Sequence, residues 1–82
     1  MELVKKAEKL LKQAFPRPDK VKLKDEDGIT GVVTSARFRG MSSLDRQELI
    51  WDALDRNLTP EERRKIVIVI AVSPEEEIAH TS

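Results

Sequence analysis

Residues 20–33 read KVKLKDEDGITGVV, and this stretch decides the fold. In its first half, Val21 and Leu23 alternate with lysines, which is the period of a strand with one buried and one solvated face. The Asp-Gly dipeptide at 27–28 is a strong signal for a tight hairpin turn. The β-branched residues that follow predict a second, antiparallel strand over 29–38.

Helices are predicted on both sides of this hairpin. Residues 2–15 place apolar side chains three and four positions apart with lysines opposite, which indicates an amphipathic helix that the prolines of PRPD end. A second helix is predicted over 43–58, with Ser42 or Ser43 as its N-cap. A third, short helix over 60–65 begins at Thr59-Pro60-Glu61-Glu62, which has the pattern of a capping box with Pro at the first helical position.

The last strand is predicted over 65–73 and contains IVIVIAV, seven apolar residues in succession. Because this run is apolar at every position, we expect a strand buried on both faces. Ser73-Pro74-Glu75-Glu76 repeats the cap pattern and predicts a short C-terminal helix, with residues 80–82 frayed.

The expected fold is α+β, an α/β sandwich with the order α-β-β-α-α-β-α in one domain over residues 1–82. The first two strands are antiparallel because a tight turn joins them, and the helical crossover makes the third strand parallel to the second. The result is a mixed three-stranded sheet with helices on one face. The core is expected to contain Val21, Leu23, Leu10, Leu11, Ile50, Leu54 and several residues of 66–72.

Composition excludes several classes of protein. The chain has 82 residues and no Cys, so a disulfide framework, a thiolate metal site and a cysteine nucleophile are excluded. The longest apolar run is far shorter than a membrane span, so we expect a cytoplasmic protein without a membrane partner. The 15 basic and 15 acidic residues balance, but residues 1–24 carry a net charge of +5 and residues 44–82 one of −4. Such a dipolar molecule can meet an anionic partner with one side only, but a solvated helix face and an exposed, lysine-rich strand edge are the favoured explanation of the asymmetry.

Residues 37–47 read RFRGMSSLDRQ. The stretch resembles the signature of the BolA family, in which a Phe is followed by Gly-x-Ser and by a basic residue four positions after the Ser. Here these are Phe38, Gly40, Ser42 and Arg46. The order and spacing of the other predicted elements, and the Ser-Pro-x-Glu at 73–76, are similar to the family along the whole chain.

The resemblance implies the BolA fold, related to the class II KH arrangement, and a non-enzymatic adaptor or regulator. The family is tied to stress response, transcriptional regulation and iron–sulfur trafficking, and its members share an iron–sulfur cluster with a monothiol glutaredoxin. They lend a His at the start of the last strand and often a His or Cys between the first two strands. In this chain the corresponding positions are Lys65 and the neighbourhood of Gly28, and the single His is His80. Since a protonated amine is a poor iron ligand, we expect no metal, no cofactor and no cluster ligand from this chain.

The alternative function is a KH-like module that binds DNA or RNA. The candidate contacts are the lysines of the first helix and first strand together with Arg37, Arg39 and Arg46. These arginines flank Gly40 and Ser42 at the start of a helix, where arginines and backbone N–H groups suit phosphate. Because the net charge is zero, we expect this binding to be weak. A basic residue in the first helical turn opposes the helix dipole, so Arg46 either pairs with Asp45 or an acid of another element, or stays free for a partner.

Three other patterns give weaker evidence of function. The GxxG at 28–31 matches the loop with which KH domains clamp nucleic acid, but it coincides with the hairpin turn and contains no basic residue. The acids at 25–27 face water in most turns of this kind. Trp51 either packs in the core or anchors a partner, and packing is favoured. One His without a partner base provides no catalytic pair, so we do not expect an enzyme.

Overall fold

The computed structural model describes residues 2–76. The elements in chain order are α1 (Glu2–Ala14), β1 (Lys20–Asp25), β2 (Ile29–Thr34), the 3₁₀ helix η1 (Ala36–Phe38), α2 (Ser43–Asp55), α3 (Pro60–Arg64) and β3 (Ile66–Val72). The predicted order is confirmed as far as Glu76. Residues 74–76 have helical conformation, whereas the rest of the expected C-terminal helix, the expected fraying of residues 80–82 and His80 lie outside the described residues.

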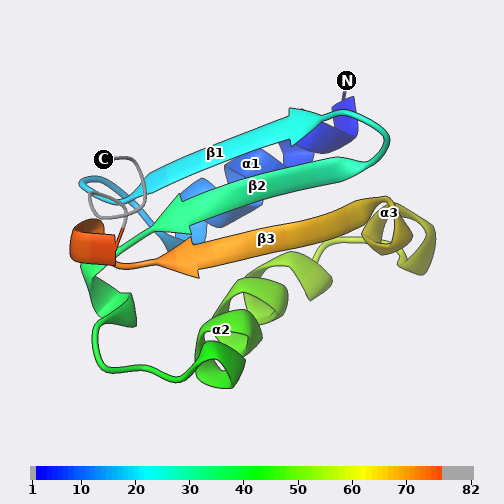
Figure 1. Cartoon of the computed structure of the whole chain (residues 1–82). Coiled ribbons are helices and arrows are strands. Elements are labelled where there is room, and N and C mark those ends of the chain that lie inside the picture. Colours follow the sequence, from blue (N-terminus) through cyan, green and yellow to red (C-terminus); the bar gives the residue numbers. More distant parts are fainter. Residues whose placement is uncertain (1, 77–82) are drawn as a thin grey trace.

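The three strands form one sheet in the order β1-β2-β3, with β1 antiparallel and β3 parallel to β2. This is the predicted mixed sheet. Helices α1 and α2 pack on one face of it, so the molecule has two layers (Figure 1). The core between the layers consists of Ala7, Leu11, Phe15, Ile29, Val33, Phe38, Ile50, Leu54, Ile66 and Val69. The predicted core residues Leu10, Val21 and Leu23 are partly buried at its margin.

The predicted strand over 29–38 is too long, because β2 ends at Thr34. The next residue, Ser35, is only 1% exposed, and its side-chain hydrogen bonds fix the turn at which β2 ends. Its hydroxyl donates to Asp19 at 2.8 Å and accepts from the backbone N–H of Arg37 at 3.1 Å. Ser35 is the N-cap of η1, so its side-chain hydrogen bonds replace the backbone hydrogen bonds that a longer β2 would form. The β propensity of residues 29–38 did not reveal this.

The second helix is also shorter than the predicted 43–58, since α2 ends at Asp55. Thr59 must be extended to serve as the N-cap of α3, and the proline after it favours the same conformation. The chain therefore leaves the helix before Leu58, which still packs against the core. The three predicted caps are confirmed: Ser42 accepts from the N–H of Asp45, Thr59 forms a complete capping box, and Ser73 accepts from the N–H of Glu76.

The expectation that the last strand is buried on both faces is wrong. β3 lies at the edge of the sheet, with Ile66 and Val69 in the core. A shift in its register with β2 between Ile29 and Thr30 interrupts the alternation of its side chains at Val67. Val67, Ile68 and Ile70 are 61%, 50% and 45% exposed. The helices cover only one face of the sheet, so the apolar residues on the other face of β3 meet solvent.

The hairpin between β1 and β2 has the backbone that its Asp-Gly sequence predicts. Asp27 and Gly28 have φ angles of 53° and 110°, in the left-handed region that such turns require. The glycines of the GxxG pattern are thus parts of a turn and a strand. Gly31 lies opposite Leu23, and a Cβ at this position would collide with the Leu23 side chain and lie 2.6 Å from the Lys22 carbonyl oxygen.

Candidate functional site

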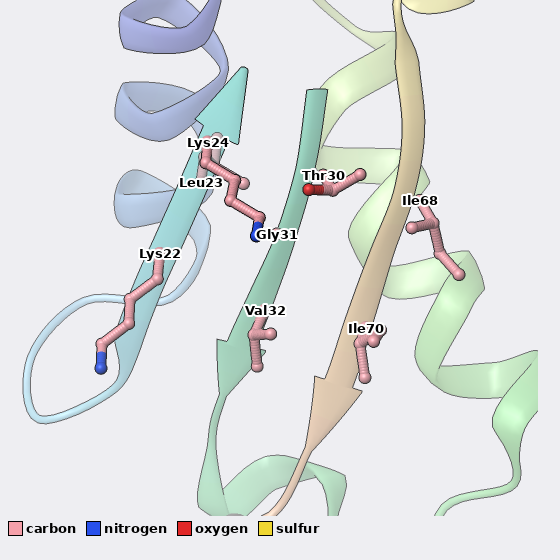
Figure 2. A pocket seen from close by; sticks show the side chains of 8 residues that line it. All are labelled: Lys22, Leu23, Lys24, Thr30, Gly31, Val32, Ile68 and Ile70. Atoms are coloured by element: carbon pink, nitrogen blue, oxygen red, sulfur yellow. The ribbon is translucent and has the colours of Figure 1, made fainter. Parts of the chain in front are cut away.

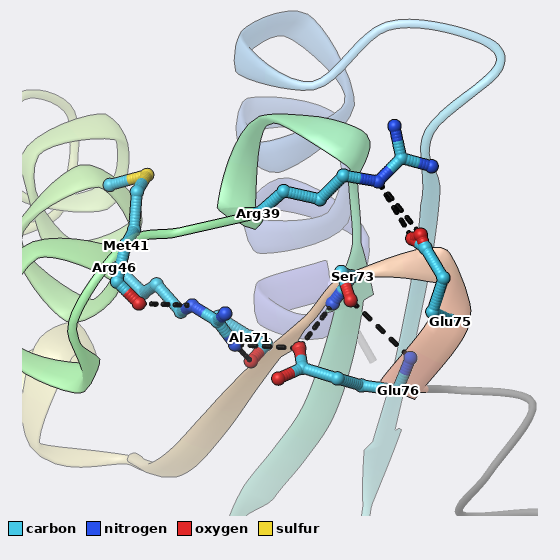
Figure 3. Close-up of polar contacts among 7 residues, drawn as sticks. All are labelled: Arg39, Met41, Arg46, Ala71, Ser73, Glu75 and Glu76. Carbon is cyan, nitrogen blue, oxygen red and sulfur yellow. Dashed lines mark hydrogen bonds and ion pairs between the residues drawn. The ribbon is translucent and has the colours of Figure 1, made fainter.

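Arg46 connects the first turn of α2 to the end of β3 (Figure 3). Its guanidinium donates to the backbone carbonyls of Met41 at 3.1 Å and Ala71 at 3.3 Å, and to the Glu76 carboxylate at 2.7 Å. It also lies over the Phe38 ring, 5.9 Å from the ring centroid. The Arg46 side chain is only 14% exposed. Of the alternatives that the sequence left open, the structure shows the ion pair with an acid of another segment, Glu76.

A second arginine joins the same two segments at the surface. Arg39 donates to both carboxylate oxygens of Glu75 at 2.7 Å. Next to this pair, Glu76 accepts from the backbone N–H of Ser73 at 2.7 Å, and the Glu76 N–H donates to the Ser73 hydroxyl at 3.3 Å. Figure 3 shows two neighbouring sets of contacts, the Arg39–Glu75 pair and the network of Arg46, Glu76 and Ser73. Both join the residues at the end of β3 to the segment that leads into α2.

Phe38 and Gly40 build the turn that presents these arginines. The Phe38 ring is completely buried and lies 5.4 Å from that of Phe15. Gly40 has a φ angle of 74°, which explains the glycine at this position of the motif. Arg37 stacks over Phe15 at 5.1 Å and donates to the Ala14 carbonyl at 2.9 Å. The predicted residues of the motif thus gather at one end of the molecule.

Lys65, the remaining predicted site residue, lies elsewhere. It caps the end of α3, before β3, whereas Arg46 and Arg39 contact residues at or beyond the other end of that strand. The Lys65 carbonyl accepts from the N–H of Ile29 at 2.8 Å, and Gly28 lies against the same carbonyl. Lys65 and Gly28 line one shallow pocket with acids of the hairpin. The two positions at which the family resemblance places cluster ligands are therefore neighbours in space.

Ion pairing alters the acidity of the carboxylates at the end of β3. The hydrogen bond from Arg46, and next the backbone N–H of Ser73, lower the pKa of Glu76 to about 2. The hydrogen bond from Arg39 lowers the pKa of Glu75. These shifts are consistent with groups that stabilise the fold, since both carboxylates are held by partners of the chain itself.

One residue of this region was not predicted. Gln47 donates its side-chain amide to the Val69 carbonyl at 2.9 Å and accepts from the Trp51 indole at 3.1 Å. Trp51 is half-buried, with the guanidinium of Arg63 4.7 Å above its ring, which agrees with packing more than with a free anchor. The sequence does place Gln47 directly after Arg46 in the first turns of α2, the helix that packs beside β3. This position could have indicated a contact with that strand.

The described residues 2–76 contain no group of three or more His, Cys, Asp or Glu side chains arranged to hold a metal ion. None of the helices in this range combines the length and apolar character needed to cross a lipid bilayer.

The sequence matches no protein-family model and no curated protein. Solved structures do match. BolA1 from Mus musculus superposes with a TM-score of 0.71 at 21% identity, covering 100% of this chain and 73% of that one. BolA1 from Arabidopsis thaliana gives 0.67 at 16% identity over 90% and 94%, and a Bol-like protein from Babesia bovis gives 0.63 at 24% identity over 96% and 93%. In this chain the matched fold consists of a mixed sheet in the order β1-β2-β3, with η1 and the Gly40 turn ahead of α2. The chain therefore has the BolA-like fold that its sequence resemblance implies.

Proposed function

We propose that the chain is a non-enzymatic BolA-like adaptor that binds a protein partner and supplies no iron ligand to it. The partner class that the resemblance points to is a monothiol glutaredoxin, in iron–sulfur or stress-response pathways. Support comes from the BolA-like fold over the whole chain and from the turn of Gly40, Ser42 and Arg46, in which Ser42 caps α2 and Arg46 pairs with Glu76.

One observation carries the part of the proposal that departs from the family. Lys65 and the hairpin at Gly28 adjoin, so a cluster between two proteins would meet both positions together. The first side chain is an ammonium group and the second position has no side chain. Neither group ligates iron at neutral pH, because the cluster binds thiolate or neutral imidazole. The adaptor would dock through the surface from Gly40 to Arg46 and through β3.

The test is an NMR titration of the isotope-labelled chain with a monothiol glutaredoxin, once as apoprotein and once with its bridging cluster. We expect amide shifts confined to residues 40–46 and β3, with equal affinity for the two forms, since the chain adds no ligand. A titration without shifts, or one in which only the cluster-loaded form binds, contradicts the proposal.

The second candidate function is a nucleic-acid-binding module of the transcription-regulatory kind. The observation in its favour is Arg37, which is exposed and bonds to a backbone carbonyl, while no carboxylate of residues 2–76 pairs with it. Arg39 and Arg46 argue for low affinity, because phosphate would have to compete with Glu75 and Glu76 for their guanidinium groups. A titration with duplex DNA in the same NMR experiment distinguishes the candidates by the residues that shift.

A further inference from the structure

The face of the sheet that the helices leave uncovered has an ordered composition. Cross-strand pairing aligns β1 with β2 and β2 with β3 so that two rows of side chains cross this face. Figure 2 shows their side chains on the near side of the sheet, with α1 and α2 behind it. The rows are Lys22–Val32–Ile70 and Lys24–Thr30–Ile68. We call these six residues the open sheet face.

Each row changes from basic to apolar in the same direction. The lysines of β1 are exposed, the residues of β2 are half-buried, and the isoleucines of β3 are half-exposed at 50% and 45%. Large aliphatic side chains on the solvent face of an edge strand are an aggregation hazard that soluble proteins avoid unless a partner uses them. They align with the basic side chains of Lys22 and Lys24, of which Lys24 has Glu26 at 3.9 Å as an exposed partner. These lysines indicate the chemistry of such a partner.

The width of the open sheet face matches one helix. The lysine column and the isoleucine column are two strand spacings apart, about 9.6 Å, and an α-helix with its side chains is about 10–12 Å wide. A helix lying along the strands would place apolar side chains on Ile68 and Ile70 and acidic side chains beside Lys22 and Lys24. Burial of the isoleucines and charge complementarity would act together.

Two other ways of using this region fit less well. An added β-strand would need free backbone groups on the outer edge of β3, but Gln47 already donates to the Val69 carbonyl and Arg46 to the Ala71 carbonyl. Single-stranded nucleic acid binds sheet faces by stacking bases on aromatic rings, and none of the six side chains is aromatic. The face therefore suits an apolar, acidic surface better than it suits bases.

We propose that the open sheet face docks an acidic amphipathic helix of a partner protein. Its apolar stripe packs on Ile68, Ile70 and Val32, and its carboxylates pair with Lys22 and Lys24. This goes beyond the adaptor function proposed above. The two surfaces share β3, but the open sheet face also includes β1 and β2 and leaves out residues 40–46, so amide shifts at Lys22 and Lys24 without shifts at 40–46 distinguish it. Either proposal can fail while the other stands.

The experiment selects binders from a library of displayed helical peptides of about 18 residues, long enough to follow β3. Every peptide carries one leucine stripe, and the positions flanking the stripe are randomised among Glu, Gln and Lys. The native chain is the bait. We expect enrichment of Glu on one flank and binding that Ile68→Glu with Ile70→Glu weakens about tenfold or more. Lys22→Glu with Lys24→Glu should reverse the selection, so that Lys is enriched on that flank.

Matched controls separate the face from general stickiness. Leu44, which is 68% exposed on α2, is the control for the isoleucines, and the exposed Lys9 of α1 is the control for the lysines. Leu44→Glu and Lys9→Glu should leave peptide affinity within about twofold. Amide shifts of the selected peptide complex must fall on β1, β2 and β3.

Four outcomes overturn the proposal. Selection without charge preference, or binding that the charge reversal does not change, removes the acidic helix as the occupant. Concentration-dependent dimers in sedimentation equilibrium that Ile68→Glu with Ile70→Glu abolishes assign the face to a second copy of the chain. Salt-sensitive binding of a single-stranded RNA with shifts on the same face assigns it to nucleic acid.

Discussion

The guanidinium of Arg46 and the carboxylate of Glu76 form a 2.7 Å ion pair between the first turn of α2 and the residues that follow β3. The pair lies above the buried Phe38 ring, and the same guanidinium also satisfies two backbone carbonyls. Arg46 thus links elements that are distant in sequence. The unfavourable interaction of its positive charge with the helix dipole is offset by its hydrogen bonds and its ion pair.

Replacing Arg46 should destabilise the protein more than replacing Arg39. Arg46→Met keeps the aliphatic stem but leaves two backbone carbonyls without their donor, so we expect a loss of about 1–3 kcal/mol in the free energy of unfolding. Arg39→Met removes an exposed pair and should leave the urea midpoint almost unchanged. Urea unfolding followed by circular dichroism measures both. Equal midpoints for the two variants would mean that Arg46 is not a structural tie.

Stability should fall as the pH is lowered from about 5 towards 2. The pKa of Glu76 is lowered to about 2 in the folded chain, while an unfolded Glu titrates near about 4.3. A carboxylate with a lowered folded pKa contributes stability that is complete above the unfolded pKa and is lost as pH falls through the folded one. Glu75 and Glu62, whose pKa values are also lowered, act in the same direction.

Glu76→Gln should flatten this pH dependence, since the variant loses one proton-linked contribution. Denaturant midpoints at several pH values between 2 and 7 give the comparison. The control is Glu48→Gln, an exposed α2 acid, which should leave the slope as it is. If Glu48→Gln flattened the slope as much as Glu76→Gln, the effect would be general charge repulsion.

A cluster ligand should be restorable at Lys65. The native chain mixed with a cluster-bridged monothiol glutaredoxin should give no new stable visible circular dichroism spectrum, because neither position 65 nor the hairpin offers a His or Cys. Lys65→His should produce such a spectrum, and Arg64→His, one residue away, should not. A mixed-cluster spectrum from the native chain that survives His80→Ala would show that another group of this chain ligates iron.

Any nucleic-acid binding at the arginines should be weak and sensitive to salt. We expect a Kd on the order of 10⁻⁴–10⁻⁶ M and a steep loss of affinity with ionic strength, since each neutralised phosphate releases counterions. Arg39→Glu with Arg46→Glu should abolish the binding of duplex DNA measured by fluorescence anisotropy. Because Arg46 supports the fold, Arg37→Glu is tested separately, and far-UV circular dichroism checks each variant. Unchanged binding in all of them would assign the contact to another surface.

Most of the fold could be predicted from local patterns. The Asp-Gly turn, the alternation of Val21 and Leu23, and the capping boxes act over a few residues, so the sequence displays them directly. The early end of α2 follows from the local cap at Thr59, whereas the other errors occurred where distant residues take part. β2 stops at Thr34 because Ser35 finds Asp19, which lies 16 residues earlier in the chain.

The candidate site was predictable residue by residue but not as an arrangement. The motif around Gly40 indicated the right turn, and Ser42 its cap. The partners of Arg39 and Arg46 come from residues 75 and 76, after the last strand, and only the folded chain brings them near. Lys65, at which the family resemblance places a cluster ligand, caps α3 ahead of β3, whereas Arg46 contacts the far end of that strand.

The sequence by itself determined the element types, their order and the parallel or antiparallel sense of the strands, because turns, caps and hydrophobic periods are local properties of the chain. Only the tertiary structure decided which face of β3 is covered. IVIVIAV is apolar at every position, so its pattern could not distinguish a central strand from an edge strand. The helices α1 and α2 pack on one face of the sheet, and Ile68 and Ile70 lie on the other. Which face the helices cover depends on how distant segments pack, and a local sequence pattern does not show this.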